Sequence, residues 1–189
     1  MKMEQLKLRR AMMFMPGNNP AMLQNAGIYG ADTVIFDVED AVAVSEKDAA
    51  RQLVHNAIKR LQYPCEVAVR INHIQTPFGL DDLKVILPAK PDLIRLPKAD
   101  SPEIVERLDT LLTEYEEELG LPLGHFKILP SIETAEGVIN AVVTARSSSR
   151  LIGLAFGAED YTATMEINRT KEGEELFNAR MNVLWGAKA

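Results

Sequence analysis

The chain has 189 residues, of which 47% are hydrophobic and 25% charged, enough for one globular domain with a sizeable core. Its 21 Lys and Arg against 27 Asp and Glu give a net charge of −6, and without a basic stripe a nucleic-acid partner is not expected. No apolar run approaches the roughly 20 residues of a membrane span. The single cysteine, Cys65, excludes an internal disulfide and fits a reducing, cytoplasmic environment.

Six short apolar runs are the predicted strands. They are aliphatic or β-branched over most of their length, which is typical of parallel strands covered on both faces. They lie at residues 11–15, 33–36, 67–71, 93–96, 126–129 and 151–156.

Amphipathic helices are predicted between these strands. The residues that we expect to cap them are Asn19, Ser45, Ser101 and Thr134. Ser45 with Asp48 has the spacing of a capping box and predicts a helix that ends near Leu61.

Alternating strands and helices predict a parallel α/β fold, either a doubly wound sheet or a barrel. No Gly-x-Gly-x-x-Gly motif follows the first strand, so dinucleotide binding has little support. Polar residues follow nearly every strand. A barrel brings all these strand ends to one face, whereas a doubly wound sheet gathers its site at one switch point. We therefore predict one domain, residues 1–189, with the fold of a TIM-type (β/α)8 barrel.

The polar residues at the strand ends are the candidate site residues. They are Pro16, Gly17 and Asn18 after the first strand, Asp37, Glu39 and Asp40 after the second, Arg70 and Asn72 after the third, Lys98 after the fourth, Glu133 after the fifth and Asp160 after the sixth. Several carboxylates beside an arginine and a lysine suit a hard cation such as Mg²⁺. Glu133 and Asp160 follow neighbouring strands and can share one ion, while Arg70 can grip a substrate carboxylate.

Each candidate also has a structural interpretation. Carboxylates at helix starts, such as Glu133 and Asp160, are favoured by the helix dipole. Arg70 can instead pair with Asp37 or Glu39 inside the barrel mouth. The helix start beside Gly17 can also hold a phosphate on free backbone N–H groups.

Six motifs at these strand ends resemble the HpcH/HpaI aldolase/citrate lyase family, and its citrate lyase β subunits above all. They are Pro16-Gly17-Asn18, Phe36-Asp37-Val38-Glu39-Asp40, Val69-Arg70-Ile71-Asn72, Pro97-Lys98, Ile132-Glu133-Thr134-Ala135 and Gly157-Ala158-Glu159-Asp160. They occur in the family's order between about Arg10 and Val183. The resemblance implies a TIM-type barrel that forms homo-oligomers, with Mg²⁺ on Glu133 and Asp160 and a substrate carboxylate on Arg70. We also assign substrate binding to Pro16, Gly17, Asn18, Asn72 and Lys98, and a supporting role to Asp37, Glu39 and Asp40.

The resemblance also implies an activity and partners. These subunits cleave a citryl thioester on an acyl carrier protein to oxaloacetate and an acetyl thioester, together with an α subunit that transfers the acyl group. A malyl-CoA or citramalyl-CoA lyase, a non-catalytic oligomerisation or regulatory fragment of the same fold, and an unrelated α/β binding module remain alternatives. The motifs do not reveal the thioester carrier or the catalytic base.

The strand count departs from the family pattern. A barrel of this type needs eight strand–helix units, and only six are counted here. We therefore expect an incomplete barrel that is not a competent lyase by itself. Residues expected on the inner faces of its first and last strands are Met13, Met15, Leu154 and Phe156.

Overall fold

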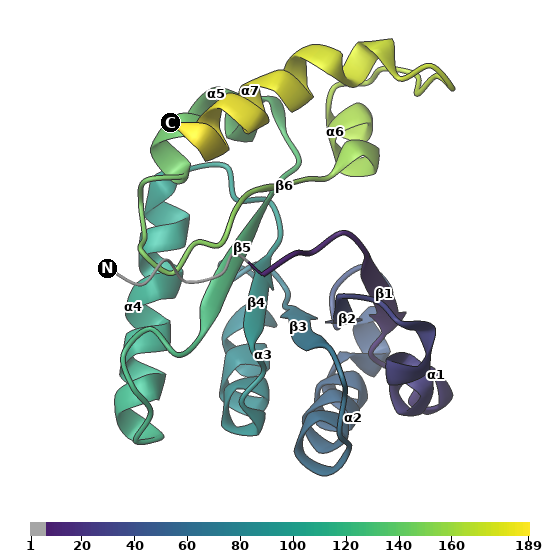
Figure 1. The fold of residues 1–189 in the computed structure, drawn as a ribbon, viewed down its shortest axis with the longest axis vertical. Helices are drawn as coiled ribbons and strands as arrows, with labels where there is room; N and C mark the ends of the chain where they lie inside the picture. Colours follow the sequence, from purple (N-terminus) through teal and green to yellow (C-terminus); the bar gives the residue numbers. More distant parts are fainter. Residues whose placement is uncertain (1–6) are drawn as a thin grey trace.

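A computed structural model describes residues 7–189 and has one parallel sheet of six strands (Figure 1). The strands are β1 (Met12–Pro16), β2 (Thr33–Asp37), β3 (Glu66–Arg70), β4 (Leu93–Leu96), β5 (Lys127–Ile132) and β6 (Ala155–Phe156). Each strand pairs with the next one in the chain, so the strand order never reverses. A doubly wound sheet would require a reversal. The sequential order confirms the barrel-type prediction, and within the described residues β1 and β6 are each paired on one side.

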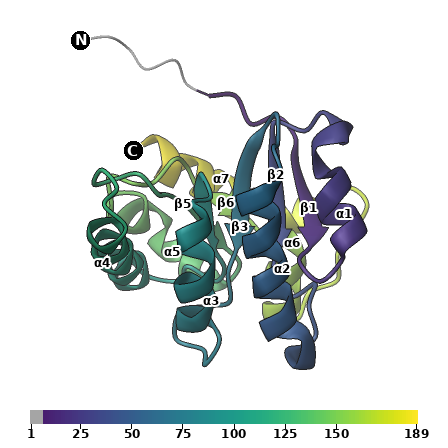
Figure 2. The same ribbon diagram turned by 90° about the horizontal axis from the view of Figure 1, so that it is seen from below.

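Helices cover one face of this sheet. They are α1 (Pro20–Asn25), α2 (Lys47–Arg60), α3 (Gly79–Ile86), α4 (Pro102–Glu118), α5 (Ala135–Thr144), α6 (Ala158–Thr164) and α7 (Phe177–Lys188), with short 3-10 turns at Ala26–Tyr29, Val44–Glu46, Leu87–Ala89 and Glu174–Leu176. Figures 1 and 2 show α1 to α4 side by side along the sheet. Two helices, α6 and α7, follow β6, and α7 lies so close to α5 that a side chain at Gly186 would meet the Ala141 backbone. No helix in the described part of the chain is long and apolar enough to cross a membrane.

Two apolar clusters occupy the two faces of the sheet. The larger lies between strands and helices and contains Val34 and Phe36 of β2 together with Val54 of α2. The smaller lies on the inner face and contains Ile35, Ala68, Leu93 and Leu129. Side chains of a strand alternate between faces, so Asp37 shares the inner face with Ile35.

The expectation that four apolar residues face inward is wrong. Met13, Met15, Leu154 and Phe156 all pack in the helix-side cluster. In the register of the sheet, Pro16 aligns with Asp37, so the inward residues of β1 are Met12 and Phe14, which alternate with Met13 and Met15.

The predicted helix starts are partly confirmed. Asn19 and Thr134 cap their helices, accepting hydrogen bonds from the backbone N–H groups of Met22 and Gly137. Ser101 occupies a cap position without a side-chain cap bond. The Ser45 prediction is wrong, because Ser45 lies within a 3-10 turn and α2 begins two residues later.

The last strand is shorter than predicted. Only Ala155–Phe156 pairs regularly with β5, and an isolated bridge joins Leu151 to Ile128. Gly153, with a φ of 155°, lies between these two pairings. The apolar run 151–156 is therefore one bridge and a two-residue strand, because its middle leaves the sheet.

A buried arginine network fixes the segment before β6 to α4. Arg150 pairs with Glu116 at 2.6 Å and with Asp109 at 2.5 Å. Glu116 is fully buried and also accepts hydrogen bonds from the backbone of Gly124 and Phe126. One carboxylate thus connects a helix end, a loop and the start of β5.

Replacing Arg150 by Met should destabilise the fold by about 3–5 kcal/mol, because it leaves the buried Glu116 carboxylate without its counter-charge. Urea denaturation measures the change. Arg107→Met, at an exposed position of α4, is the control and should change stability by less than about 0.5 kcal/mol. Equal stability of the two variants would contradict the structural role of Arg150.

Candidate functional site

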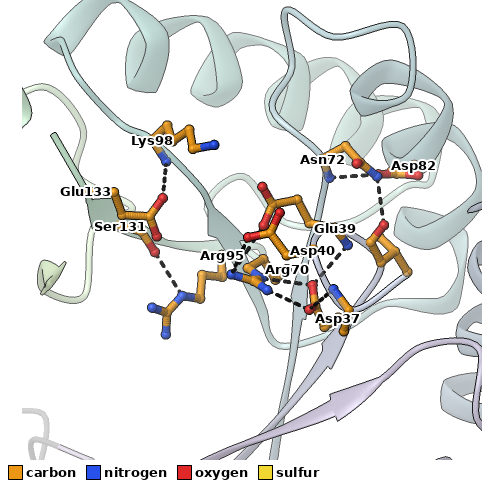
Figure 3. Close-up of polar contacts among 12 residues, drawn as sticks. Asp37, Glu39, Asp40, Arg70, Asn72, Asp82, Arg95, Lys98, Ser131 and Glu133 are labelled. Atoms are coloured by element: carbon orange, nitrogen blue, oxygen red, sulfur yellow. Dashed lines mark hydrogen bonds and ion pairs between the residues drawn. The ribbon is translucent and has the colours of Figure 1, made fainter. Parts of the chain in front are cut away.

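The candidate site lies where the inner face of the sheet meets the carboxyl ends of its strands (Figure 3). Asp37 of β2, Arg70 of β3 and Arg95 of β4 are register partners, so their side chains form one row on the inner face. Ser131 of β5 and Glu133, which follows that strand, continue this inner face. The parallel arrangement thus brings residues distant in sequence to one edge.

A two-point ion pair holds Arg70 in place. Its Nε and Nη2 donate to the two carboxylate oxygens of Asp37 at 2.8 and 2.6 Å. Asp37 is buried and also accepts from the backbone N–H groups of Glu39 and Ala41. Burial would lower the pKa of Arg70, but the hydrogen bonds and charge of Asp37 outweigh it and raise the pKa. Arg70 is therefore a fixed cation whose remaining N–H groups, on Nη1 and Nη2, are oriented by Asp37.

The structural interpretation of Arg70 is confirmed. The pairing with Asp37 and Glu39 is present, with Nη1 at 3.2 Å from Glu39 Oε2. Asp40 is farther away, at 3.8 Å, and is more than half exposed. Because a guanidinium offers a second, end-on pair of donors, substrate binding by Arg70 stays a prediction.

Glu133 is buried and positioned by two unusual backbone features. Its Oε2 accepts a hydrogen bond from the backbone N–H of Lys98 at 3.0 Å, and Lys98 adopts a φ of 47°. A left-handed conformation at a non-glycine residue costs of order 1 kcal/mol, so this turn is maintained by its surroundings. A Cβ at Gly157 would lie 2.5 Å from the Glu133 side chain, so any other residue there would force that side chain to move.

The negative charge of Asp160 acts on the carboxylate of Glu133. Burial raises the pKa of Glu133, the Lys98 hydrogen bond opposes this, and the charge of Asp160 raises it further. A cation stabilises such a like-charge pair. No cluster of three or more His, Cys, Asp or Glu able to hold a metal occurs within residues 7–189. Mg²⁺ is commonly bound by one or two carboxylates plus water and substrate oxygens, so two suffice for this ion.

The other predicted site residues make internal contacts. The amide of Asn72 is buried and donates to Asp82 at 2.6 Å and to the Val38 carbonyl at 2.9 Å. Asn72 therefore fixes the end of β3 to the end of β2 and to α3. Lys98 contributes its backbone N–H as described above, and Figure 3 shows its side chain pointing away from Glu133.

The loop after β1 has fewer free donors than expected. The N–H of Gly17 donates to the Asp37 carbonyl at 2.7 Å, and that of Asn19 donates to the Pro16 carbonyl. The Asn18 side chain donates to Glu46. Neither the Gly17 nor the Asn19 N–H is available for a phosphate, and substrate binding by Pro16, Gly17 and Asn18 stays a prediction.

Sequence reasoning missed Arg95. This residue is only 9% exposed, and its Nε donates to Ser131 Oγ at 2.9 Å. The sequence does contain a signal for this residue, because an arginine interrupts the apolar run Leu93–Leu96. A charged residue inside a buried strand needs a partner or a function.

A surface hollow of about 610 Å³ lies at the opposite, amino-terminal ends of the strands, and Cys65 and Glu66 line it. Glu66 is already paired with Arg9 and Thr33. Burial raises the pKa of the Cys65 thiol, which disfavours the reactive thiolate. This end of the sheet has the features of a stabilising rather than a chemical site.

Glu39 provides a pH-dependent prediction. Burial raises its pKa to about 7, partly offset by Arg70 and reinforced by Asp40 and Asp37. The unfolded value is about 4.3. Between these two pKa values the folded state keeps a proton on Glu39 that the unfolded state has lost. The stability that Glu39 contributes is therefore fully present below about pH 4.3 and is lost as the pH rises through about 7.

Glu39→Gln should consequently be more stable than the wild type at pH 8, by about 1–2 kcal/mol after allowance for solvent screening, and nearly equal to it at pH 4.5. Urea denaturation at both pH values measures this. Glu106→Gln, at an exposed position of α4, should show no such difference between pH values. A pH-independent effect of Glu39→Gln would refute the titration.

Comparison with known proteins identifies the family. The model of the HpcH/HpaI aldolase/citrate lyase family matches residues 10–189. Citrate lyase subunit beta of Leuconostoc mesenteroides subsp. cremoris is 48% identical over 184 residues, which are 97% of this chain and 61% of the relative. Citrate lyase subunit beta of Haemophilus influenzae is 44% identical, over 97% of this chain and 64% of the relative.

A solved structure gives the same result for the fold. The citrate lyase beta subunit from Mycobacterium tuberculosis, complexed with oxaloacetate and magnesium, superposes with a TM-score of 0.76 at 28% identity and covers 95% of this chain and 75% of that one. The TIM-type fold prediction is thereby confirmed. The chain spans less than two thirds of the length of the curated relatives described above. Since the match extends over nearly all of its residues, the chain belongs to the HpcH/HpaI aldolase/citrate lyase family.

Proposed function

We propose that the protein is a magnesium-dependent carbon–carbon lyase that cleaves a citryl thioester on an acyl carrier protein to oxaloacetate and an acetyl thioester. The observation that carries this proposal is the gathering of a fixed guanidinium and two carboxylates, Arg70 with Glu133 and Asp160, at one edge of the barrel-type sheet. The identities of 48% and 44% to citrate lyase β subunits support the choice of substrate. The oxaloacetate and magnesium complex of the mycobacterial relative supports the choice of product and metal.

Each side chain has a role that follows from its contacts. Glu133 and Asp160 would hold Mg²⁺, which when bound polarises a hydroxyl or carbonyl oxygen of the substrate. Arg70, oriented by Asp37, would bind a substrate carboxylate through its end-on N–H pair. Asp37 is therefore a positioning residue. Asn72 and Lys98 hold the strand ends, and the base that removes the hydroxyl proton is not assigned to any described residue.

The proposed partners follow from the proposed activity. They are a citrate lyase α subunit, which transfers the acyl group, and an acyl carrier protein with a phosphopantetheine-type prosthetic group. We also propose that the protein forms a homo-oligomer and acts in the cytoplasm. The edges of β1 and β6, each paired on one side within residues 7–189, are surfaces at which further strands can add.

The test measures oxaloacetate released from citryl-acyl carrier protein and from citryl-CoA, with Mg²⁺ or with a chelator. The chain is assayed alone and fused to the parts of the Leuconostoc relative that lie outside the matched region. Because the sheet is open at β1 and β6, we expect the fused version to be the more active. Cleavage only of malyl-CoA or citramalyl-CoA would reassign the substrate, and no cleavage by either version would refute the lyase proposal.

A further inference from the structure

Arg95 differs from the other buried arginines in its charge balance. Arg51, Arg70 and Arg150 each form ion pairs with carboxylates. Arg95 is equally inaccessible, yet no ion pair to it is found within residues 7–189, and Ser131 Oγ is the acceptor for its Nε. Burying an uncompensated charge is unfavourable unless an anion or a hydrogen-bonding partner approaches it.

The position of Arg95 places it in the candidate site. It is the register partner of Arg70 on the next strand. The Cζ atoms of both arginines lie 4.9 Å from the centre of the Phe14 ring, which also faces inward. Glu133 is the carboxylate whose charge acts most strongly on Arg95. Arg95 therefore borders the same region as the proposed metal ligand and the proposed carboxylate-binding arginine.

The donors left on Arg95 are suited to a carboxylate. Ser131 fixes Nε, and Figure 3 shows the two terminal nitrogens pointing away from the other labelled side chains. Those nitrogens can present two parallel N–H groups, which match the two oxygens of a carboxylate. Arg70 stands among three carboxylates, Asp37, Glu39 and Asp40, whereas Arg95, the next arginine in this row, forms no ion pair within residues 7–189.

We infer that Arg95 binds a second carboxylate of the substrate and so selects dicarboxylic over monocarboxylic 2-oxo acid units. This inference rests on the proposed function. A citryl thioester has two free carboxylates, and both leave on oxaloacetate when the carbon–carbon bond breaks. The carboxylate beside the carbonyl is assigned to Arg70 and the distal one to Arg95. A substrate that yields a monocarboxylic 2-oxo acid has nothing to place against Arg95.

The test compares binding of freshly dissolved oxaloacetate and pyruvate, with Mg²⁺ present, by isothermal titration calorimetry. Pyruvate keeps the carbonyl and its adjacent carboxylate but lacks the distal one. The wild type should prefer oxaloacetate. Arg95→Met, which keeps an unbranched side chain but removes the guanidinium, should lower oxaloacetate affinity about 10- to 100-fold and leave pyruvate affinity within about threefold. Arg95→Lys should retain part of the preference, because it retains the charge.

The controls separate the possible failures. Arg107→Met, at an exposed position, should bind both acids as the wild type does, and thermal unfolding checks that each variant is folded. An unchanged preference in Arg95→Met, or a wild type that binds both acids equally, would overturn the Arg95 inference and leave the proposed function intact. The same comparison is made with the fused version, and binding of neither acid by either version would overturn both. If Arg95→Met does not fold, the Arg95→Lys variant is used to test the inference. An Arg95→Lys variant that binds both acids more weakly but keeps the full wild-type preference for oxaloacetate would count against the inference.

Discussion

Replacing Asp160 by Asn should weaken Mg²⁺ binding by more than about 100-fold, because one of the two proposed charged ligands is lost and an amide oxygen carries no charge. The half-buried Asp160 lies in the first turn of α6, and its charge acts on the buried Glu133. Isothermal titration with MgCl₂ measures the affinity directly. The expected result does not depend on turnover, so it tests the metal site separately from the lyase activity.

The neighbouring Glu159 provides a matched control. It is in the same turn, is largely exposed and pairs with Arg169. Glu159→Gln removes the same formal charge one residue away and should leave Mg²⁺ affinity within about twofold, since exposed charges are screened by solvent. If Asp160→Asn and Glu159→Gln weakened binding equally, the effect would be one of general charge, and the metal assignment would fail.

The sequence predicted the class of fold and the edge of the sheet at which the candidate site residues lie. Both depend on short-range patterns, because near-continuous apolar runs that alternate with amphipathic helices specify a parallel sheet. The carboxyl ends of parallel strands must then meet at one edge. Asp37, Arg70 and Glu133 were found in this way, and each is an inward-facing residue at or just after the end of its strand.

What the sequence could not supply is the set of contacts between strands and helices. Asn72 was expected to face a substrate, but Asp82, ten residues later on α3, takes its amide. Lys98 was predicted to bind substrate, but the sequence did not show that its strained backbone positions Glu133. Such contacts depend on the geometry of the loops, which the hydrophobic pattern of the sequence does not specify.

Arg95 was missed for a different reason. It lies inside a four-residue strand, so it was counted as an exception within an apolar run. The alternation of side chains along the strand could have identified it. Arg95 alternates with Ile94 and Leu96, which pack toward the helices, so its own side chain must face inward with Leu93. A charged inward residue at this level of a barrel lies near the site that the strand ends form.

In the fused version, Arg70→Lys should lower kcat/KM for thioester cleavage by about 10- to 100-fold, the loss expected when hydrogen bonds to a charged group are removed. The lysine keeps the positive charge, but an ammonium group on a flexible chain cannot bind Asp37 at two points and also present an oriented pair of N–H groups to a substrate. The first loss lowers stability, since Asp37 is buried and needs its counter-charge. The second loss lowers activity.

The exposed pair of Arg10 and Asp32 gives a matched control, because it is also an arginine–aspartate pair, at 2.9 Å, but 76% of the Arg10 side chain is exposed. Arg10→Lys should change stability by less than about 1 kcal/mol and leave kcat/KM unchanged. Kinetics are measured at a temperature where denaturation curves show each variant fully folded, so that lost stability is not mistaken for lost binding. Wild-type kcat/KM in a folded Arg70→Lys variant would leave Arg70 with a structural role alone. Asp37→Asn keeps the arginine but removes its charged partner. If a folded Asp37→Asn variant also loses kcat/KM, this would support the view that Asp37 acts by orienting Arg70.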